Sequence, residues 1–247
     1  MSFTILPVKN EDAVEGFAVA DMAFANLNSM LYTTWPLSRE SAERLMETRL
    51  KLLDRMPVAT MFKAVDIFTG RIIGIARWIV EEEDEIVCED VEDAVEGMMA
   101  QAIPETDEVV SRAFYTMALS GKREVLGGIQ ERMEAQTAAQ QREVLLRENM
   151  LDIPVTRAKT KVVLPRRVEL ETIFTHPEFQ RHGVATALLQ WGIKEAQRLG
   201  AMMYLEATEE GRSLYSHNGF QAVKVVNFDA TKYAGKGKHT YTVGFLP

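Results

Sequence analysis

Segments with apolar residues at helical spacing alternate along the chain with apolar, β-branched segments typical of strands. These patterns predict its secondary structure. Residues 3–8, with the sequence FTILPV, have the apolar and β-branched character of a strand. Residues 10–27 carry apolar side chains at helical intervals, and their first turn is acidic, as the positive end of a helix dipole favours. The chain is therefore expected to start with a strand followed by a helix.

The next segments continue this succession of helices and strands. Ser38 precedes the helical pattern of residues 39–56 and can act as its N-cap. Residues 59–80 then divide at Thr69 and Gly70 into two β-rich halves, which predicts an antiparallel hairpin. The first eighty residues are thus predicted to form strand, helix, helix, strand and strand.

The middle of the chain has a different composition. Residues 81–110 contain thirteen acidic residues and neither lysine nor arginine, and helical patterns follow in residues 107–119 and 128–149. We interpret residues 82–165 as an acidic helical insertion within a single domain that spans residues 1–247. This composition fits either a solvated helical appendage or a surface that covers a substrate or meets a partner.

From residue 168 onward the predicted elements are short and regular. Gly183 marks the start of a helix and Gly200 marks its end. Helices that alternate with strands in this way favour an α/β fold, in which helices cover a mixed sheet. The predicted strands are residues 168–175, 201–208, 220–228 and 239–245, and residues 209–219 form a short second helix.

Composition and charge narrow the class of protein. The 247 residues are 47% hydrophobic and 26% charged, as in ordinary soluble proteins, and the formal net charge is -8. This charge disfavours a general attraction to nucleic acid or to an anionic membrane. The single cysteine, Cys88, excludes an intrachain disulfide, and no targeting or membrane-spanning pattern is apparent. We therefore expect a soluble, cytoplasmic protein with no nucleic-acid or membrane partner.

The stretch QRHGVATALLQWG, residues 180–192, joins a turn of small residues to the start of a helix. The first amides of a helix lack partners within the helix and can bind an anion where no side chain blocks the approach. Gly183 and Ala185 would clear that approach, and Arg181 adds positive charge. Taken alone, the turn fits either a diphosphate site or tight packing. The rest of the helix is structural, with one apolar face made of Ala185, Leu188, Leu189, Gly192, Ala196 and Leu199.

Two motifs make the meaning of this turn more specific. The hexapeptide QRHGVA, residues 180–185, resembles the Q/R-x-x-G-x-G/A signature of the GNAT superfamily of N-acetyltransferases, with alanine in the last small position. Tyr215 lies four residues before Gly219 and Phe220, which resembles the closing motif of the same superfamily. The resemblance covers residues 168–245 well, the first eighty residues in element order, and the acidic insertion not at all. It implies a mixed, mostly antiparallel central sheet flanked by helices.

The resemblance also implies acetyl-coenzyme A as the acetyl donor and Tyr215 as the general acid for the departing sulfur. Members of the superfamily often have asparagine seven residues before this tyrosine. Thr208 stands there instead, and its hydroxyl can still exchange a hydrogen bond with the pantetheine arm. In the superfamily the end of the preceding strand pairs with that arm and the following turn holds the diphosphate, positions that here are Ile173, Phe174, Thr175, Gln180, Arg181, His182, Gly183, Val184, Ala185 and Thr186.

Three glutamates are candidates for the base that deprotonates an acceptor amine. Because side chains alternate along a strand, Glu169 and Glu171 are expected on one face together with Ile173, and Glu206 shares a face with Tyr204. The opposite face of the first strand is expected to carry Val168, Leu170, Thr172 and Phe174. If the two strands part, as they do in the superfamily, the three carboxylates can line an acceptor cleft and raise one another's pKa. If this face of the strands is simply exposed to solvent, the three carboxylates would have no catalytic role.

Other residues add less to the functional hypothesis. Glu171 and Glu206 are also the candidates to bind the acceptor. Trp35, in the loop between the first two helices, can line the acceptor pocket or belong to the core. The four histidines show no spacing typical of metal ligands, and we expect no metal.

The leading hypothesis is an N-acetyltransferase that moves an acetyl group from acetyl-coenzyme A to a primary amine of a small molecule, by direct transfer in a ternary complex. An acidic cleft would attract such a cation. The alternatives are an enzyme that acts on protein lysines or N-termini, and a coenzyme A-binding sensor or pseudoenzyme that no longer transfers. The protein is expected to be a monomer or a homodimer.

Overall fold

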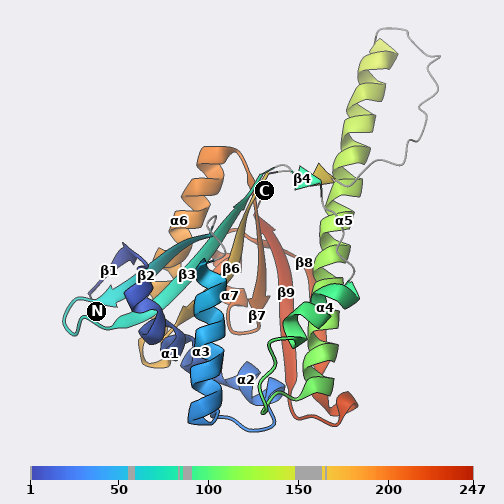
Figure 1. Ribbon diagram of the computed structural model, residues 1–247. Helices are drawn as coiled ribbons and strands as arrows, with labels where there is room; N and C mark the ends of the chain where they lie inside the picture. The colour runs from blue at the N-terminus through green and yellow to red at the C-terminus, as the bar shows by residue number, and fades with distance from the viewer. Residues whose placement is uncertain are drawn as a thin grey trace.

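A seven-stranded sheet forms the centre of the computed structural model (Figure 1). Its strands are β1 (Phe3–Pro7), β2 (Ala59–Asp66), β3 (Ile72–Glu81), β6 (Arg167–Thr175), β7 (Met202–Thr208), β8 (Gln221–Asp229) and β9 (Lys238–Leu246). They lie in the order β1-β2-β3-β6-β7-β9-β8. All neighbouring pairs are antiparallel except β6 and β7, which are parallel. The predicted mixed and mostly antiparallel sheet is confirmed.

The structure describes residues 2–54, 59–82, 84–85, 91–147, 163–164 and 166–246, without the side chains of 52–54, 59, 84–85, 129–147 and 163–164. Cys88 lies outside these ranges. The chain leaves the sheet after Glu81 and returns at Arg167, and these two residues are paired neighbours in β3 and β6. A short pair of strands, β4 (Asp84–Glu85) and β5 (Val163–Leu164), follows directly beyond this point.

Seven α-helices and three short 3-10 helices are present in the described residues. The helix predicted over residues 10–27 is divided at Phe24, where the backbone leaves the helical region. Ser38 caps the next helix as predicted, because its Oγ accepts a hydrogen bond from the Ser41 amide at 3.2 Å. The helices are α1 (Ala13–Ala23), α2 (Ala25–Leu31), α3 (Arg39–Asp54), α4 (Val91–Met99), α5 (Glu108–Arg147), α6 (Val184–Leu199), α7 (Arg212–His217), η1 (Asn10–Asp12), η2 (Pro177–Phe179) and η3 (Ala230–Tyr233).

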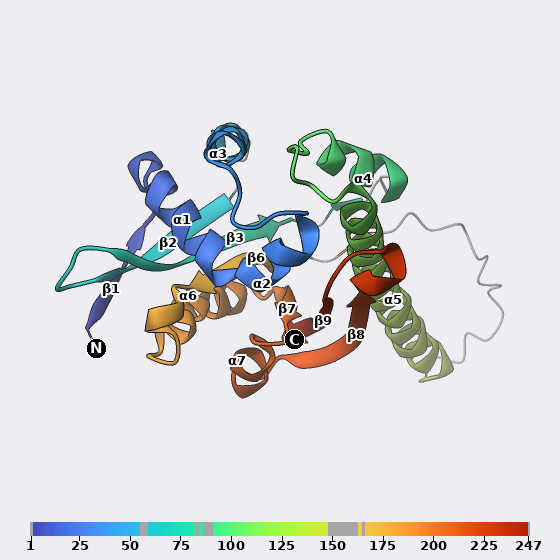
Figure 2. The same ribbon diagram turned by 90° about the horizontal axis from the view of Figure 1, so that it is seen from below.

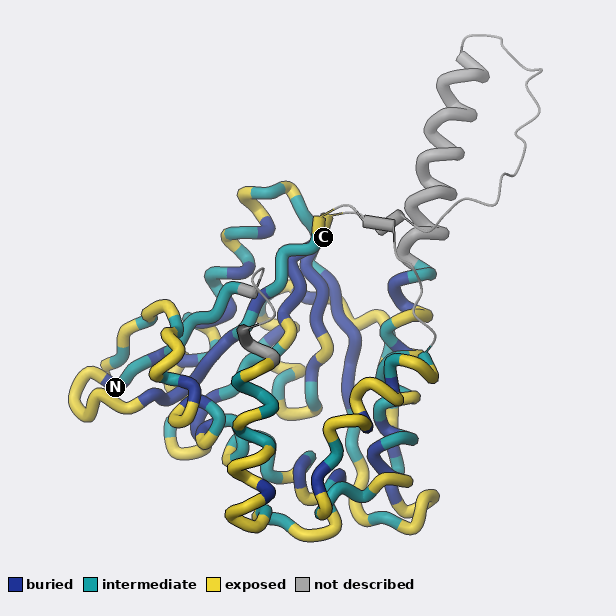
Figure 3. Tube along the Cα trace, viewed as in Figure 1, coloured by how far each residue is buried: buried dark blue, intermediate teal, exposed yellow. Residues whose placement is uncertain are grey.

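The main core lies between the sheet and α6. Trp78 of β3 is fully buried there, and Gly192 of α6 lies against its indole ring. A Cβ at residue 192 would come within 2.3 Å of that ring, so only glycine allows this close approach. The predicted apolar face of the helix is buried at Leu188, Leu189, Gly192 and Ala196. Figure 3 shows the buried strands of this core between more exposed helices.

The opposite face of the sheet is covered by α1 and α5 (Figure 2). The two helical patterns predicted for the middle of the chain are one helix of 40 residues, α5. Its Val125 and Leu126 pack against β7 and β9. Gly121 allows this approach, because a Cβ there would lie 2.6 Å from the Tyr241 hydroxyl. The hydroxyl in turn donates to the carbonyl oxygens of Met117 and Ala118 at 3.2 Å. The predicted insertion thus supplies a layer of the fold.

Candidate active site

The strands β6 and β7 pair over only part of their lengths. Parallel pairing joins residues 167–170 of β6 with residues 202–205 of β7 and then stops. Beyond that point β6 continues beside β3 as far as Thr175, and β7 continues beside β9 as far as Thr208. The facing edges of the two strands therefore part halfway along, and their main-chain groups there are free to pair with an extended ligand.

A β-bulge lies at the point where the strands part. Leu170 of β6 is opposite Trp78 of β3, and Thr172 is opposite the preceding residue, Arg77. Glu171 is therefore the extra residue of the bulge and has no partner residue across the ladder. Such bulges bend a strand and redirect its side chains.

The bulge makes the predicted alternation of faces wrong for the second half of β6. Ile173 packs into the core on the α6 side together with Leu170, and does not share a face with Glu169. Phe174 lies on the other side, where its ring meets that of Phe24 edge to face at 5.9 Å. An inserted residue shifts the period of two by one position, which a pattern of residue types does not reveal.

Glu169 is buried between the sheet and α5. Its carboxylate forms an ion pair and hydrogen bond with Lys122 of α5, and Arg167 Nε lies 3.9 Å from its other oxygen. The Lys122 ammonium group also lies 5.3 Å from the centre of the Tyr204 ring. The oxygens of Glu169 are thus engaged in holding α5 on the sheet.

Glu171 also has a cation of its own. Its Oε2 lies 2.7 Å from Nε of Arg77 on β3. Burial raises the pKa of Glu171, the positive charge of Arg77 lowers it, and the nearby carboxylate of Glu169 raises it further. The net shift is upward, although about a third of the side chain (34%) remains exposed.

Glu206 differs from the other two glutamates. The Tyr204 hydroxyl donates a hydrogen bond to its Oε1 at 2.7 Å, and within the described residues it forms no ion pair with lysine, arginine or histidine. Burial raises the pKa of Glu206, whereas the bond from Tyr204 and the charge of Lys122 lower it by less. The residue keeps access to solvent. Of the three carboxylates, Glu206 is the one best placed to accept a proton.

The cations of this site were not identified from the sequence. Arg77 carried a usable signal, because it is the one charged residue in the apolar run IIGIARWIV of residues 72–80. Lys122 carried none, since it lies in a helix with many charged residues and more than 45 positions before Glu169. Its position depends on how α5 packs on the sheet.

We expect Lys122→Met to destabilise the protein by about 2–3 kcal/mol, because it leaves the buried carboxylate of Glu169 with only the distant Arg167. Denaturant unfolding followed by circular dichroism measures this difference. Lys224→Met is the matched control, since Lys224 pairs with the more exposed Glu124 of the same helix, and we expect a loss within about 1 kcal/mol. Equal losses in the two variants would contradict the buried-pair interpretation.

The turn before α6 is open and has unused amides. Arg181 and Gly183 both have left-handed backbone conformations, with φ of 63° and 81°. No backbone amide in the range 181–186 donates a hydrogen bond to another described residue, and Gly183 caps α6 without a side-chain bond. A Cβ at Gly183 would meet no atom within 4 Å. Successive free amides beside left-handed residues form a concave site that suits an anion.

The remaining cofactor candidates surround this turn and the end of β7. Thr175 ends β6, and its Oγ is buried without a hydrogen-bond partner, while its carbonyl oxygen accepts a bond from the Gln180 side chain at 3.4 Å. The exposed His182 ring lies 2.7 Å from the Gln180 carbonyl oxygen. Thr208 ends β7, and its carbonyl oxygen accepts the Gly211 amide in the turn that leads to α7.

Tyr215 lies on α7, on the opposite side of the sheet from Glu206. It is 6% exposed and packs edge to face on Phe220 with ring centres 5.8 Å apart. Its hydroxyl forms no hydrogen bond to another described residue. Burial raises the pKa of Tyr215, so the phenol keeps its proton at neutral pH and can donate it.

Trp35 lies apart from these groups in its described contacts. It stacks on Tyr32 with ring centres 5.7 Å apart, in the connection between α2 and α3. Of the histidines, His217 is exposed and contacts the Ser213 carbonyl oxygen at 2.6 Å. The described part of the chain holds no cluster of three or more histidine, cysteine, aspartate or glutamate residues that could bind a metal. None of its helices has both the length and the apolar character needed to cross a bilayer.

The sequence of the candidate site was compared with families of known proteins. Residues 151–222 match the family model described as an acetyltransferase (GNAT) domain. No curated protein matches the chain. The match includes the turn at Gly183 and Tyr215, which are the two motifs that carried the resemblance.

Solved structures with the same fold span the whole chain at low sequence identity. Arylalkylamine N-acetyltransferase like 5b from mosquito is 11% identical, with a TM-score of 0.57 and 99% of each chain covered. Polyamine N-acetyltransferase of Drosophila melanogaster, which forms N-acetylagmatine, is 12% identical, with a TM-score of 0.53 and 99% of each chain covered. The histone acetyltransferase HPA2 and related acetyltransferase of Corynebacterium glutamicum is 18% identical, with a TM-score of 0.51, and 100% of this chain and 97% of that one are covered.

The family model places a GNAT acetyltransferase domain in residues 151–222, and the resemblance seen in the sequence is confirmed. The whole chain has the mixed α/β fold of the solved structures named above. The matched domain is described as that of an acetyltransferase.

Proposed function

We propose that the protein transfers an acetyl group from acetyl-coenzyme A to a primary amine of a small molecule, directly and in a ternary complex. The observation that carries this proposal is the run of unpartnered amides at 181–186, beside an open glycine and next to the point where β6 and β7 part. Unpartnered amides at an open turn before a helix are available to a ligand that carries negative charge. A diphosphate is an anion of suitable size and charge.

The residues present fit the coenzyme on both sides of this turn. The amides of 181–186 would hold the diphosphate, and Arg181 would add positive charge. The free edge of β6 at 173–175 would pair with the amide groups of the pantetheine arm, which is an extended chain of the right kind for a strand edge. The coenzyme would supply an activated thioester at the parting of the strands.

Two side chains on opposite faces of the sheet would accept and donate the protons of the reaction. Glu206, on the α5 face, would take the proton from the attacking amine. Tyr215, on the α6 face, would donate its proton to the sulfur as the carbon–sulfur bond breaks. The new carbon–nitrogen bond would form between the two residues, where the strands part. Lys122 and Arg77 already neutralise Glu169 and Glu171. The carboxylate of Glu206 therefore remains to attract a cationic amine.

The direct test is a coenzyme-binding and thiol-release assay with a panel of amines. We expect tight binding of acetyl-coenzyme A and release of free thiol with at least one small primary amine. Binding of the coenzyme without thiol release from any small amine or peptide would favour a sensor. Release only with peptides would favour a protein acetyltransferase. Failure to bind coenzyme A would overturn the proposal.

Gly183→Ala tests the diphosphate cradle. The new Cβ meets no protein atom and would take up open space beside the proposed diphosphate site, so we expect the dissociation constant of coenzyme A to rise about tenfold or more. The left-handed backbone costs the variant about 1 kcal/mol in stability. Gly70→Ala is the matched control, because Gly70 has φ of 70°, equal free space and a place in the β2–β3 turn. Calorimetric titration should show unchanged coenzyme binding in the control.

A further inference from the structure

A cavity of about 450 Å³ lies between α7 and the sheet, on the far side of β7 from the parting of the strands. Residues of β7, α7, β8 and β9 line it, and none of its lining residues belongs to β6 or α6. The cavity is therefore separate from the turn at Gly183. Its volume is within the range of small-molecule sites.

The hollow results from small side chains on one face of the sheet. Successive residues of β9 alternate, so that Tyr241 and Val243 pack under α5 while Thr242 and Gly244 face α7. Opposite these two on β7 are Ala207 and Leu205. Because α7 has only six residues, it covers this face incompletely.

One polar group in the wall of the cavity lacks a partner. Thr242 is 5% exposed, and its Oγ is buried without a hydrogen bond. A buried hydroxyl without a partner is unfavourable, and such groups often mark a place where a ligand or water completes the bonding. Thr242 can donate a hydrogen bond to an acceptor that enters the cavity.

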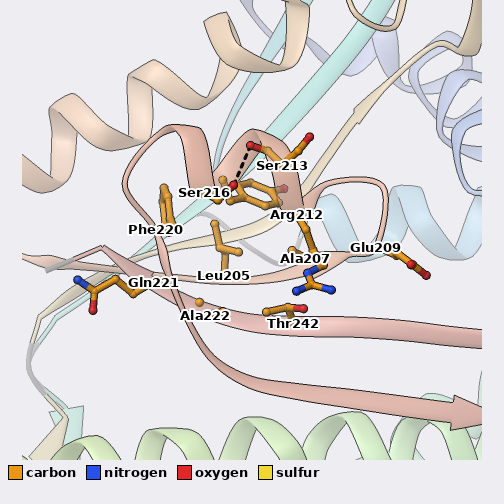
Figure 4. Close-up of a pocket in the computed structure, with 12 residues that line it drawn as sticks. Leu205, Ala207, Glu209, Arg212, Ser213, Ser216, Phe220, Gln221, Ala222 and Thr242 are labelled. Atoms are coloured by element: carbon orange, nitrogen blue, oxygen red, sulfur yellow. Dashed lines mark hydrogen bonds between the residues drawn. The ribbon is translucent and has the colours of Figure 1, made fainter.

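The positively charged side chain of Arg212 lies beside the same cavity. Figure 4 shows the Arg212 side chain extending from α7 towards Thr242, whereas the Glu209 carboxylate points away from the hollow. Within the described residues Arg212 forms no ion pair, in contrast to Arg198 of α6, which pairs with Glu195 at 2.6 Å. A guanidinium group can hold a carboxylate through two parallel hydrogen bonds.

We propose that this cavity binds a small organic carboxylate, with its charge on Arg212 and Thr242. Its apolar part would lie on Leu205, Ala207 and Phe220, which are buried apolar residues of the lining. Tyr215 lines the same cavity, so an occupant would also touch the residue assigned as proton donor. The proposal shares Tyr215 with the acetyl transfer proposed above but does not require that reaction.

The test is a titration of the full-length protein with hexanoate, followed by ligand-observed NMR, with hexanamide as the neutral control. We expect saturable binding of hexanoate and at least tenfold weaker binding of hexanamide. Arg212→Gln should weaken hexanoate about tenfold or more, and Thr242→Val about threefold or more. Arg198→Gln should leave it unchanged. Thr242→Val should fold and melt no lower than the wild type, because it removes an unpaired hydroxyl at constant volume.

The proposal is overturned by absence of saturable binding, by equal binding to Arg212→Gln and wild type, or by equal affinity for hexanamide. Coenzyme A is added in a further titration. Competitive displacement of hexanoate would assign the cavity to the coenzyme site and would also overturn the proposal. Hexanoate binding that persists in a protein unable to bind coenzyme A would leave the cavity proposal standing and reject only the transferase.

Discussion

Glu206→Gln is expected to lower kcat/KM for amine acceptors by about 10²–10⁴-fold, because it removes the group that we propose as the base for the attacking amine. The substitution keeps an oxygen that can accept the bond from Tyr204. The pH profile gives the more specific measurement. Glu206 must be ionised to act, and burial raises its pKa above the ordinary 4.5. Activity should therefore fall as the pH falls through a value above 4.5, and the glutamine variant should lose this acid limb.

Glu171→Gln is the matched control for this experiment. Glu171 lies on the neighbouring strand and its pKa is also raised, but Arg77 already engages its carboxylate. We expect less than about a tenfold loss in kcat/KM and an unchanged acid limb. If Glu171→Gln removes the acid limb and Glu206→Gln keeps it, the base is Glu171 and the assignment must be reversed.

Tyr215→Phe is expected to lower kcat by about 10²-fold or more while the dissociation constant of coenzyme A changes less than about threefold. In the proposed mechanism the phenol is needed only when the thiolate departs, whereas the ring that packs on Phe220 is retained in the variant. Because burial raises the pKa of Tyr215, its loss of a proton should not limit the rate below pH 10. Single-turnover kinetics and calorimetric titration measure the two quantities separately.

Tyr241→Phe separates catalysis from packing. Tyr241 is also buried, but its hydroxyl bonds to the carbonyl oxygens of Met117 and Ala118 on α5. We expect its loss to cost about 1 kcal/mol in stability and to leave kcat unchanged. A Tyr215→Phe variant that resembles this control, or that loses turnover and affinity equally, would make Tyr215 a packing residue.

The order of elements followed from the sequence because each element depends on local patterns. Ser38 caps its helix, Gly200 ends another, and the hairpin turns at Thr69 and Gly70, as the residue types predict. The turn at Gly183 was recognisable because a left-handed glycine before a helix leaves a trace in the sequence. Two errors were also local. The break at Phe24 has no glycine or proline to mark it, and the two middle helices are continuous.

The functional differences between the glutamates depended on tertiary structure. Glu169, Glu171 and Glu206 have the same chemistry, and no sequence pattern favoured one of them over the others. Lys122 reaches Glu169 from a helix far along the chain, and Arg77 reaches Glu171 across a strand pair. The bulge at Glu171 depends on the register between β3 and β6, and this register is set by both strands together.

By itself the sequence determined the class of fold, because the order of elements rests on conformational preferences of neighbouring residues. The turn before α6 and Tyr215 were singled out by their resemblance to the GNAT motifs. Only the tertiary structure decided which carboxylate lacks a cation, which side chains share a face of β6, and that a cavity with an unpaired hydroxyl lies under α7. These features arise where segments distant in the sequence come into contact. Burial and ion pairing depend on those contacts and not on the local sequence.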